Sequence, residues 1–122
     1  MRPLIVAAVL IAAAPALARD RAADAPPATP IGPSRTCLPL SSIEETLVRS
    51  DRVIDFRTIG RRLYRVTLPQ RCPGLGSERR FGYATSIGQL CAQDLITVLY
   101  ASGPVRGASC GLAPFQPVAL TR

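Results

Sequence analysis

Two aspartates are the acidic residues of this chain best placed to do chemistry. Asp55 and Asp94 each adjoin an expected β-strand, and two carboxyl groups about 5–10 Å apart can act as acid and base in glycoside hydrolysis. Asp also commonly accepts hydrogen bonds from backbone N–H groups at bends, which is the interpretation we favour for Asp94. Asp55 is equally suited to pair with Arg57 or Arg65 at the surface. The two carboxylates therefore support a hydrolase only as an alternative.

Arginines form the second candidate set. The chain has 15 basic residues, all of them Arg, and eight acids, so its formal net charge is +7. Arg makes bidentate contacts with carboxylates and phosphates, so a cluster could hold a lipid phosphate, an acidic glycan or an acidic protein. A basic surface also promotes solubility without any ligand, and that alternative stays open. The candidate anion-binding residues are Arg61, Arg62 and Arg65 in one expected hairpin, and Arg71, Arg79 and Arg80 in the following loop.

Several kinds of active site are excluded by the residues that the chain lacks. It has no His and no Lys, so Ser-His-Asp, Cys-His and Ser-Lys sites cannot form, and no imidazole can ligate a metal. The Gly-rich segment at residues 72–77 has no Lys after its glycines, unlike a phosphate-binding loop. The four cysteines are 35, 19 and 19 positions apart, whereas structural zinc favours C-x₂₋₄-C pairs. We expect no metal and no cofactor, and we name no catalytic residue.

Residues 1–18 have the pattern of a secretory signal peptide. A positive start at Arg2, an apolar stretch over residues 3–14 and the small-residue motif at 16–18 follow in the usual order. An uncleaved anchor is the alternative, but Pro15 interrupts the apolar run short of the ~20 residues that a spanning helix needs. We expect a mature chain without a transmembrane segment, in the periplasm or secreted. We expect no nucleic-acid partner, because export removes the chain from the cytoplasm and most of its six aromatic residues are needed in the core.

The mature chain divides into two parts by composition. Residues 19–36 contain four prolines and only one large apolar residue, Ile31, which predicts a Pro-rich leader that is extended or disordered. Residues 37–122 form a single β-rich domain of 86 residues. That size is large enough to fold alone and small enough to benefit from covalent links.

Short β-branched and aromatic runs predict the strands of this domain. Residues 53–59 and 63–68 flank Gly60-Arg61-Arg62 and predict a hairpin, and residues 95–100 predict a central strand. Residues 109–118 predict a weaker strand that Pro114 and Pro117 restrict to an edge or to irregular pairing. Residues 43–48 suit a capped helix or a strand, and we favour the strand narrowly. The fold class is all-β: a small disulfide-stapled sandwich or partly open barrel of five or six short strands.

Four cysteines in an exported chain predict two disulfides. Three pairings are possible, and sequence alone does not choose between them. If the chain reverses near Gly103, Cys110 lies opposite a residue close to Thr97, and Cys91 is too far along to reach it. The favoured pairing is therefore nested, with Cys37 bonded to Cys110 and Cys72 to Cys91.

The pattern resembles an uncharacterised family of small exported four-cysteine proteins of Gram-negative bacteria, known only as a domain of unknown function. The resemblance covers nearly the whole of residues 37–122 and implies a periplasmic domain, but no activity or ligand. It rests on Cys37, Val53-Ile54-Asp55, Tyr64 to Leu68, Cys72-Pro73-Gly74-Leu75, Phe81 with Tyr83, Leu90-Cys91-x-x-Asp94-x-Ile96-x-Val98, and Cys110-x-Leu112-x-x-Phe115.

Three functions follow as hypotheses. The first is a non-enzymatic periplasmic or secreted domain whose Arg-rich surface binds an anionic envelope component or an acidic protein. The second is a carboxylate-based hydrolase of an envelope polymer that uses Asp55 and Asp94. The third is an inhibitor or assembly factor that presents residues 71–90 to another exported protein.

Overall fold

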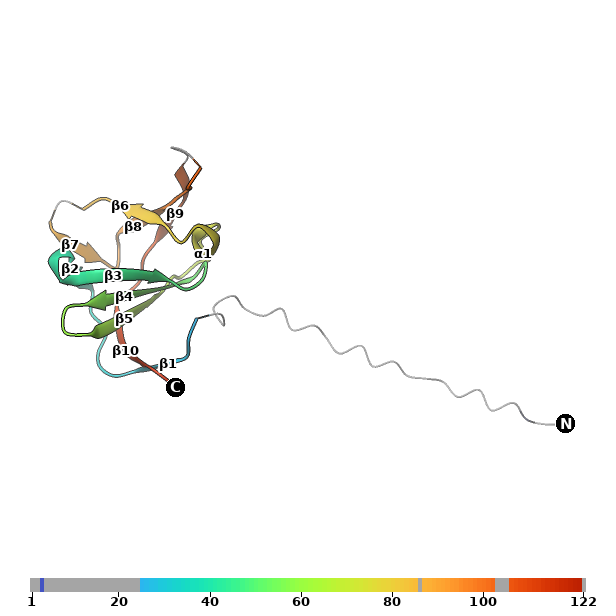
Figure 1. The fold of residues 1–122 in the computed structure, drawn as a ribbon, viewed down its shortest axis with the longest axis horizontal. Coiled ribbons are helices and arrows are strands. Elements are labelled where there is room, and N and C mark those ends of the chain that lie inside the picture. Colours follow the sequence, from blue (N-terminus) through green and yellow to red (C-terminus); the bar gives the residue numbers. More distant parts are fainter. Residues whose placement is uncertain (1–2, 4–24, 86, 103–105, 122) are drawn as a thin grey trace.

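The computed structural model describes residues 3, 25–85, 87–102 and 106–121 (Figure 1). Apart from Pro3, the expected signal peptide at residues 1–18 lies outside the described residues, as do residues 19–24 of the expected leader. No helix in the described part of the chain is long and apolar enough to span a membrane.

A five-stranded antiparallel sheet forms one layer of the domain, with strands in the order β1-β10-β5-β4-β3. The expected hairpin is confirmed, because β4 and β5 pair along their whole length. Gly60 and Arg61, with φ of 86° and 62°, make the left-handed turn between them. The ambiguous segment at 43–48 is a strand. The bounds are β1 Ala28–Pro30, β3 Ile43–Val48, β4 Val53–Thr58, β5 Arg62–Thr67 and β10 Gln116–Leu120.

Two smaller sheets complete the fold. In the three-stranded sheet, β8 (Leu95–Leu99) lies between β6 (Phe81–Tyr83) and β9 (Arg106–Gly111), which confirms the expected central strand. In the two-stranded sheet, β2 (Cys37–Pro39) pairs with β7 (Gln89–Cys91). The only helical segments among the described residues are a 3₁₀ turn at Leu40–Ser42 and the single-turn α1 at Leu75–Glu78.

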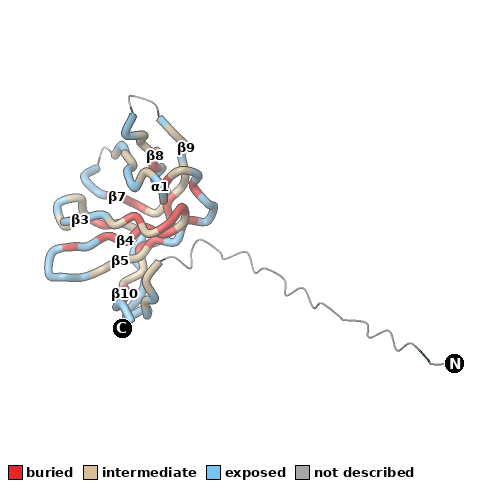
Figure 2. The backbone as a smooth tube through the Cα atoms, turned by 45° about the vertical axis from the view of Figure 1, so that its right-hand side comes forward, coloured by how far each residue is buried: buried red, intermediate tan, exposed pale blue. Residues whose placement is uncertain are grey.

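Aromatic rings join the layers at the core. Alternation along β4 and β5 places Ile54 and Phe56 on the same face as their partners Val66 and Tyr64. The ring of Phe56 meets Phe115 edge-on at 5.4 Å and Phe81 of β6 at 6.4 Å. Buried residues accordingly gather where the sheets meet (Figure 2). The fold is all-β and disulfide-linked as expected, with ten strands in the described residues rather than five or six.

The expected single strand at 109–118 is wrong, because the segment contributes to two strands, β9 and β10. β9 lies at the edge of its sheet and its pairing has a register shift, as expected, whereas β10 lies inside its sheet between β1 and β5. The carbonyl of Pro117 accepts a hydrogen bond from Ile31 N at 3.0 Å. The N and C=O groups of one strand residue point to the same side of the strand. The nitrogen of Pro117, which carries no hydrogen, therefore also faces Ile31, just beyond the end of β1, and not β5. The pairing of β10 with β5 therefore loses no donor.

The expected disorder of the leader is wrong for residues 28–36. Strand β1 pairs with β10, and Arg35 exchanges two backbone hydrogen bonds of 2.8 Å with Phe115. An edge strand tolerates proline because one side of it needs no ladder partner. Backbone pairing holds this segment, and composition does not reveal backbone pairing. We call residues 31–35 the N-terminal strap.

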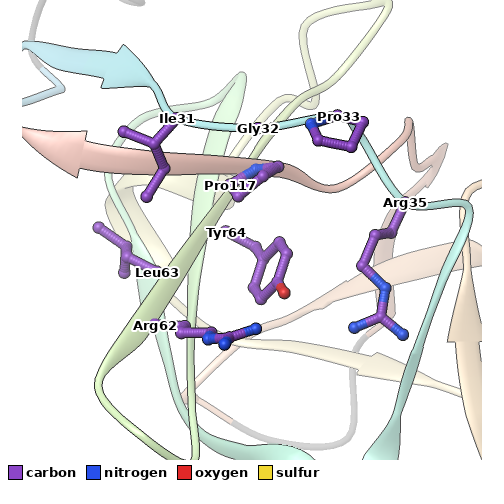
Figure 3. A pocket seen from close by; sticks show the side chains of 8 residues that line it. All are labelled: Ile31, Gly32, Pro33, Arg35, Arg62, Leu63, Tyr64 and Pro117. Atoms are coloured by element: carbon purple, nitrogen blue, oxygen red, sulfur yellow. The ribbon is translucent and has the colours of Figure 1, made fainter.

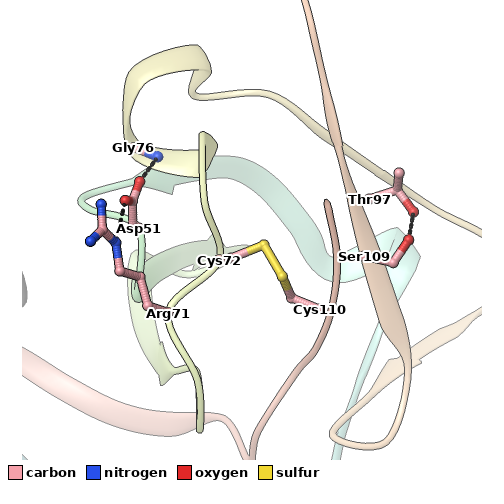
Figure 4. Close-up of a disulfide and its surroundings, with 7 residues drawn as sticks. All are labelled: Asp51, Arg71, Cys72, Gly76, Thr97, Ser109 and Cys110. Carbon is pink, nitrogen blue, oxygen red and sulfur yellow. Dashed lines mark hydrogen bonds and ion pairs between the residues drawn. A yellow bond between two sulfur atoms is a disulfide. The ribbon is translucent and has the colours of Figure 1, made fainter. Parts of the chain in front are cut away.

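All four cysteines form disulfides, but the nested pairing is wrong: the bonds are Cys37–Cys91 and Cys72–Cys110. Cys110 lies opposite Ile96 in the β8–β9 pair, so the inference that Cys91 cannot reach it holds. The sequence did not predict the pairing of β2 with β7, and this pairing places Cys37 directly opposite Cys91. Figure 4 shows the Cys72–Cys110 disulfide near Asp51, whose carboxylate accepts hydrogen bonds from Arg71 Nε and Gly76 N.

We expect the two disulfides to stabilise the domain by similar amounts. They close sequence separations of 54 and 38 residues, and loop-closure entropy gives about 4 kcal/mol for each. Replacing Cys37 and Cys91 by Ala, or Cys72 and Cys110 by Ala, should lower the free energy of unfolding by about that amount in a urea titration. A loss below about 1 kcal/mol for either pair would contradict this role.

Candidate functional site

A cleft of about 440 Å³ opens where the N-terminal strap passes over β5 and β10 (Figure 3). Tyr64 lies at its base with a side chain only 4% exposed, because alternation along β5 turns this residue toward the core. We call this the Tyr64 cleft. It is lined by Ile31, Gly32, Pro33, Arg35, Arg62, Leu63, Tyr64 and Pro117.

Two arginines from distant segments converge at the Tyr64 hydroxyl. Arg35 comes from the strap and is held by its backbone bonds to Phe115. Arg62 begins β5, and its carbonyl accepts a bond from Thr58 Oγ1 at 3.4 Å. Figure 3 shows both guanidinium groups turned toward the hydroxyl end of the ring. Neither arginine forms an ion pair with a carboxylate among the described residues.

These guanidinium groups change the acidity of the phenol. Hydrogen bonding from Arg35 is the largest cause that lowers the pKa of Tyr64 below 10.0. Burial opposes it, and Arg62 adds a further lowering by hydrogen bonding and by its charge. Positive charge therefore concentrates at the hydroxyl, which is the electrostatic environment that favours a bound anion.

A second depression adjoins the first and shares Arg35, Arg62 and Tyr64 with it. Its volume is about 350 Å³. The hydroxyls of Ser42 and Thr58 already have partners, because Ser42 Oγ donates to Pro39 O at 2.7 Å and Thr58 Oγ1 donates to Arg62 O. We call this the Ser42 cleft. Its remaining lining residues are Leu38, Pro39, Ser42, Thr58, Ile59 and Gly60.

The six arginines predicted from the sequence do not form one surface. Arg65 and Arg71 are bound to Asp55 and Asp51. Of the six, only Arg62 lines the Tyr64 cleft. The hairpin turn that carries Arg61 and Arg62 lies at the opposite end of the β4–β5 ribbon from α1, which Arg79 and Arg80 follow (Figure 1).

Sequence reasoning missed Arg35 and Tyr64. It placed Arg35 in a disordered leader and treated the tyrosine as a core residue. The alternation of β5 does indicate that Arg62 and Tyr64 share a face, since they are two positions apart. No sequence signal indicates that Arg35 joins them.

Asp55 is a structural residue at the centre of an ion-pair network. Its side chain is fully buried, with Arg65 Nε 2.8 Å from Oδ1 and both Arg65 Nη2 and Arg49 Nε 3.0 Å from Oδ2. The expected pairing with Arg65 is confirmed, but it is buried rather than at the surface. Arg57 instead pairs with Glu45 on the same sheet.

Asp94 has the turn role that the sequence favoured. Its Oδ2 accepts a bond from Cys91 N at 2.7 Å, and its backbone joins β7 to β8. The depression of about 600 Å³ that Asp94 lines does not include Asp55. The two carboxylates therefore do not share a groove in the described structure. No group of three or more residues suited to hold a metal occurs among the described residues.

Comparison with family models, with curated proteins and with solved structures finds no match to the chain.

We expect Asp55→Asn to destabilise the fold by about 3–5 kcal/mol, because it removes a buried countercharge from two arginines. The matched control is Glu45→Gln, which breaks the exposed pair with Arg57 and should cost about 0–1 kcal/mol. Urea unfolding of both variants measures the difference. Equal losses would show that burial of Asp55 has no energetic consequence.

We also expect Arg35→Gln to raise the pKa of Tyr64. The folded protein releases this proton at lower pH than the unfolded chain, so folding gains stability as pH rises through the lowered pKa, and the gain is complete above about 10. At neutral pH the phenol is protonated in both states, so its lowered pKa adds nothing to the stability of the fold. Phenolate absorbance during alkaline titration measures the shift, and Tyr64→Phe identifies the transition. An unchanged transition in Arg35→Gln would refute the assignment.

Proposed function

We propose that this protein is a non-enzymatic exported domain that binds an anionic envelope component or an acidic protein, and that the anion is held at the Tyr64 cleft. One observation carries the proposal. Arg35 and Arg62 lie beside the Tyr64 hydroxyl at the cleft and have no carboxylate partner among the described residues, while Arg49, Arg57, Arg65 and Arg71 all have one.

The chemistry of guanidinium supports this choice. Two planar groups with several N–H donors each can contact the oxygens of one phosphate or carboxylate from two sides. The Tyr64 hydroxyl adds a third donor in its neutral form. These groups lie at the wall of a cleft, where the local dielectric is lower than in water and each contact is stronger than at an open surface.

The proposed compartment rests on covalent chemistry and sequence. Two disulfides persist in oxidising compartments such as the periplasm or the exterior, and residues 1–18 have the pattern of an export signal. The resemblance to exported four-cysteine proteins agrees with this compartment and remains a proposal.

We expect the protein to sediment with phosphatidylglycerol vesicles at low salt and to be released as salt rises, with little binding to phosphatidylcholine. Arg35→Gln and Arg62→Gln should each weaken binding by roughly 10- to 100-fold, since one charge-assisted hydrogen bond contributes about 1.5–3 kcal/mol.

The matched control is the pair of variants Arg79→Gln and Arg80→Gln. They remove the same charge from an exposed segment that lines neither the Tyr64 cleft nor the Ser42 cleft, so they should weaken binding by less than twofold. Equal losses in all four variants would show that net charge alone drives binding and would overturn the site. Near-ultraviolet circular dichroism checks that each variant is folded.

A further inference from the structure

The walls of the Tyr64 cleft specify more than a negative charge. We propose that its ligand is an anionic lipid with a single alkyl chain: the head group lies between Arg35 and Arg62, and the chain lies against Ile31, Leu63 and Pro117. This inference rests on the proposed function and names the class of ligand for the same site.

The walls of the cleft away from the two arginines are apolar. Ile31, Pro33, Leu63 and Pro117 present only carbon at their side chains. Ile31 is 65% exposed, so a large apolar side chain stands at the rim with little of its own protein against it. Apolar surface of this kind is covered favourably by an alkyl chain.

Part of the backbone at the wall offers no polar partner to a ligand. The N–H of Ile31 donates to Pro117 O, and the carbonyl of Gly32 accepts from Gln116 Nε2 at 2.8 Å. Pro33 and Pro117 have no N–H. A peptide in this cleft would bury amide groups without partners, which is costly, whereas an alkyl chain has none. The walls therefore favour a lipid over an acidic protein segment.

The charged groups and the apolar walls lie at different ends of the Tyr64 cleft. Arg35, Arg62 and Tyr64 also line the Ser42 cleft, so the charged end of the Tyr64 cleft is the end shared with its neighbour. A head group there can keep part of its hydration in the Ser42 cleft while the chain extends the other way, along the strap. The volume of about 440 Å³ falls in the usual range for small-molecule sites, roughly 300–1,000 Å³.

The test is calorimetric titration of the full chain with inorganic phosphate, hexyl phosphate and decyl phosphate, all below their micelle concentrations. We expect affinity to rise with chain length, by about fourfold for each methylene that is buried. Decanol should bind weakly, because it has no charge for the arginines. Arg62→Gln should weaken binding of all three phosphates.

Three exposed isoleucines provide matched variants. Ile31→Ser should weaken decyl phosphate at least tenfold and leave inorganic phosphate unchanged. Ile59→Ser, in the Ser42 cleft and 62% exposed, and Ile87→Ser, outside both clefts and 69% exposed, should change neither. Their exposure makes all three suitable for substitution without loss of the fold.

The outcomes separate this inference from the proposed function. Equal affinity for all chain lengths, with loss in Arg62→Gln, would overturn the lipid and leave the anion site standing. Tighter binding of the acidic peptide acetyl-Leu-Glu-Leu-amide than of decyl phosphate would also overturn the lipid. If Arg35→Gln and Arg62→Gln change neither vesicle binding nor phosphate binding, the anion site itself fails.

Discussion

The backbone bridge between Arg35 and Phe115 is the contact on which the candidate site depends. Phe115 is fully buried and its ring meets Phe56, which pairs across the sheet with Tyr64. The two backbone hydrogen bonds of Phe115 hold Arg35 beside that same tyrosine. The core and the site are thus connected through Phe115 as well as through Tyr64 itself, so loosening of the Phe115 ring would also displace the guanidinium of Arg35.

The distribution of carboxylates decides which arginines remain available. Asp51, Asp55 and Glu45 each pair with at least one arginine, and Asp94 is committed to a backbone N–H. A chain with 15 arginines and eight acids must leave several guanidinium groups without a carboxylate. Most exposed arginines can be hydrated at little cost, but a pair gathered at a cleft wall repels itself and is relieved by an anion. Arg35 and Arg62 differ from the other arginines that lack a carboxylate because they lie together at the wall of the Tyr64 cleft.

The sequence predicts the elements whose side chains carry a periodic pattern. The alternation in residues 63–68 and the apolar run at 95–100 gave strands at the right places, and the turn role of Asp94 followed from its position before a strand. The strap, β1 and the β2–β7 pair leave no such pattern, because each of these strands is only three residues long and their pairing is made by backbone groups, which every residue carries. The disulfide pairing and the role of Arg35 were missed for this one reason: both require knowing which short segments lie side by side.

Proline explains why a cleft exists where the strap crosses the sheet. Pairing of β1 with β10 extends through the bond from Ile31 to Pro117, but Pro117 has no N–H to return, so the ladder stops there. It resumes at the bridge between Arg35 and Phe115. In between, strap residues 32–34 lie opposite Gln116 alone, whose side chain binds the carbonyl of Gly32. Three residues against one force the strap away from the sheet, and the space beneath it is the Tyr64 cleft. A residue that interrupts a sheet in this way creates the opening, and its ring adds an apolar surface to the wall.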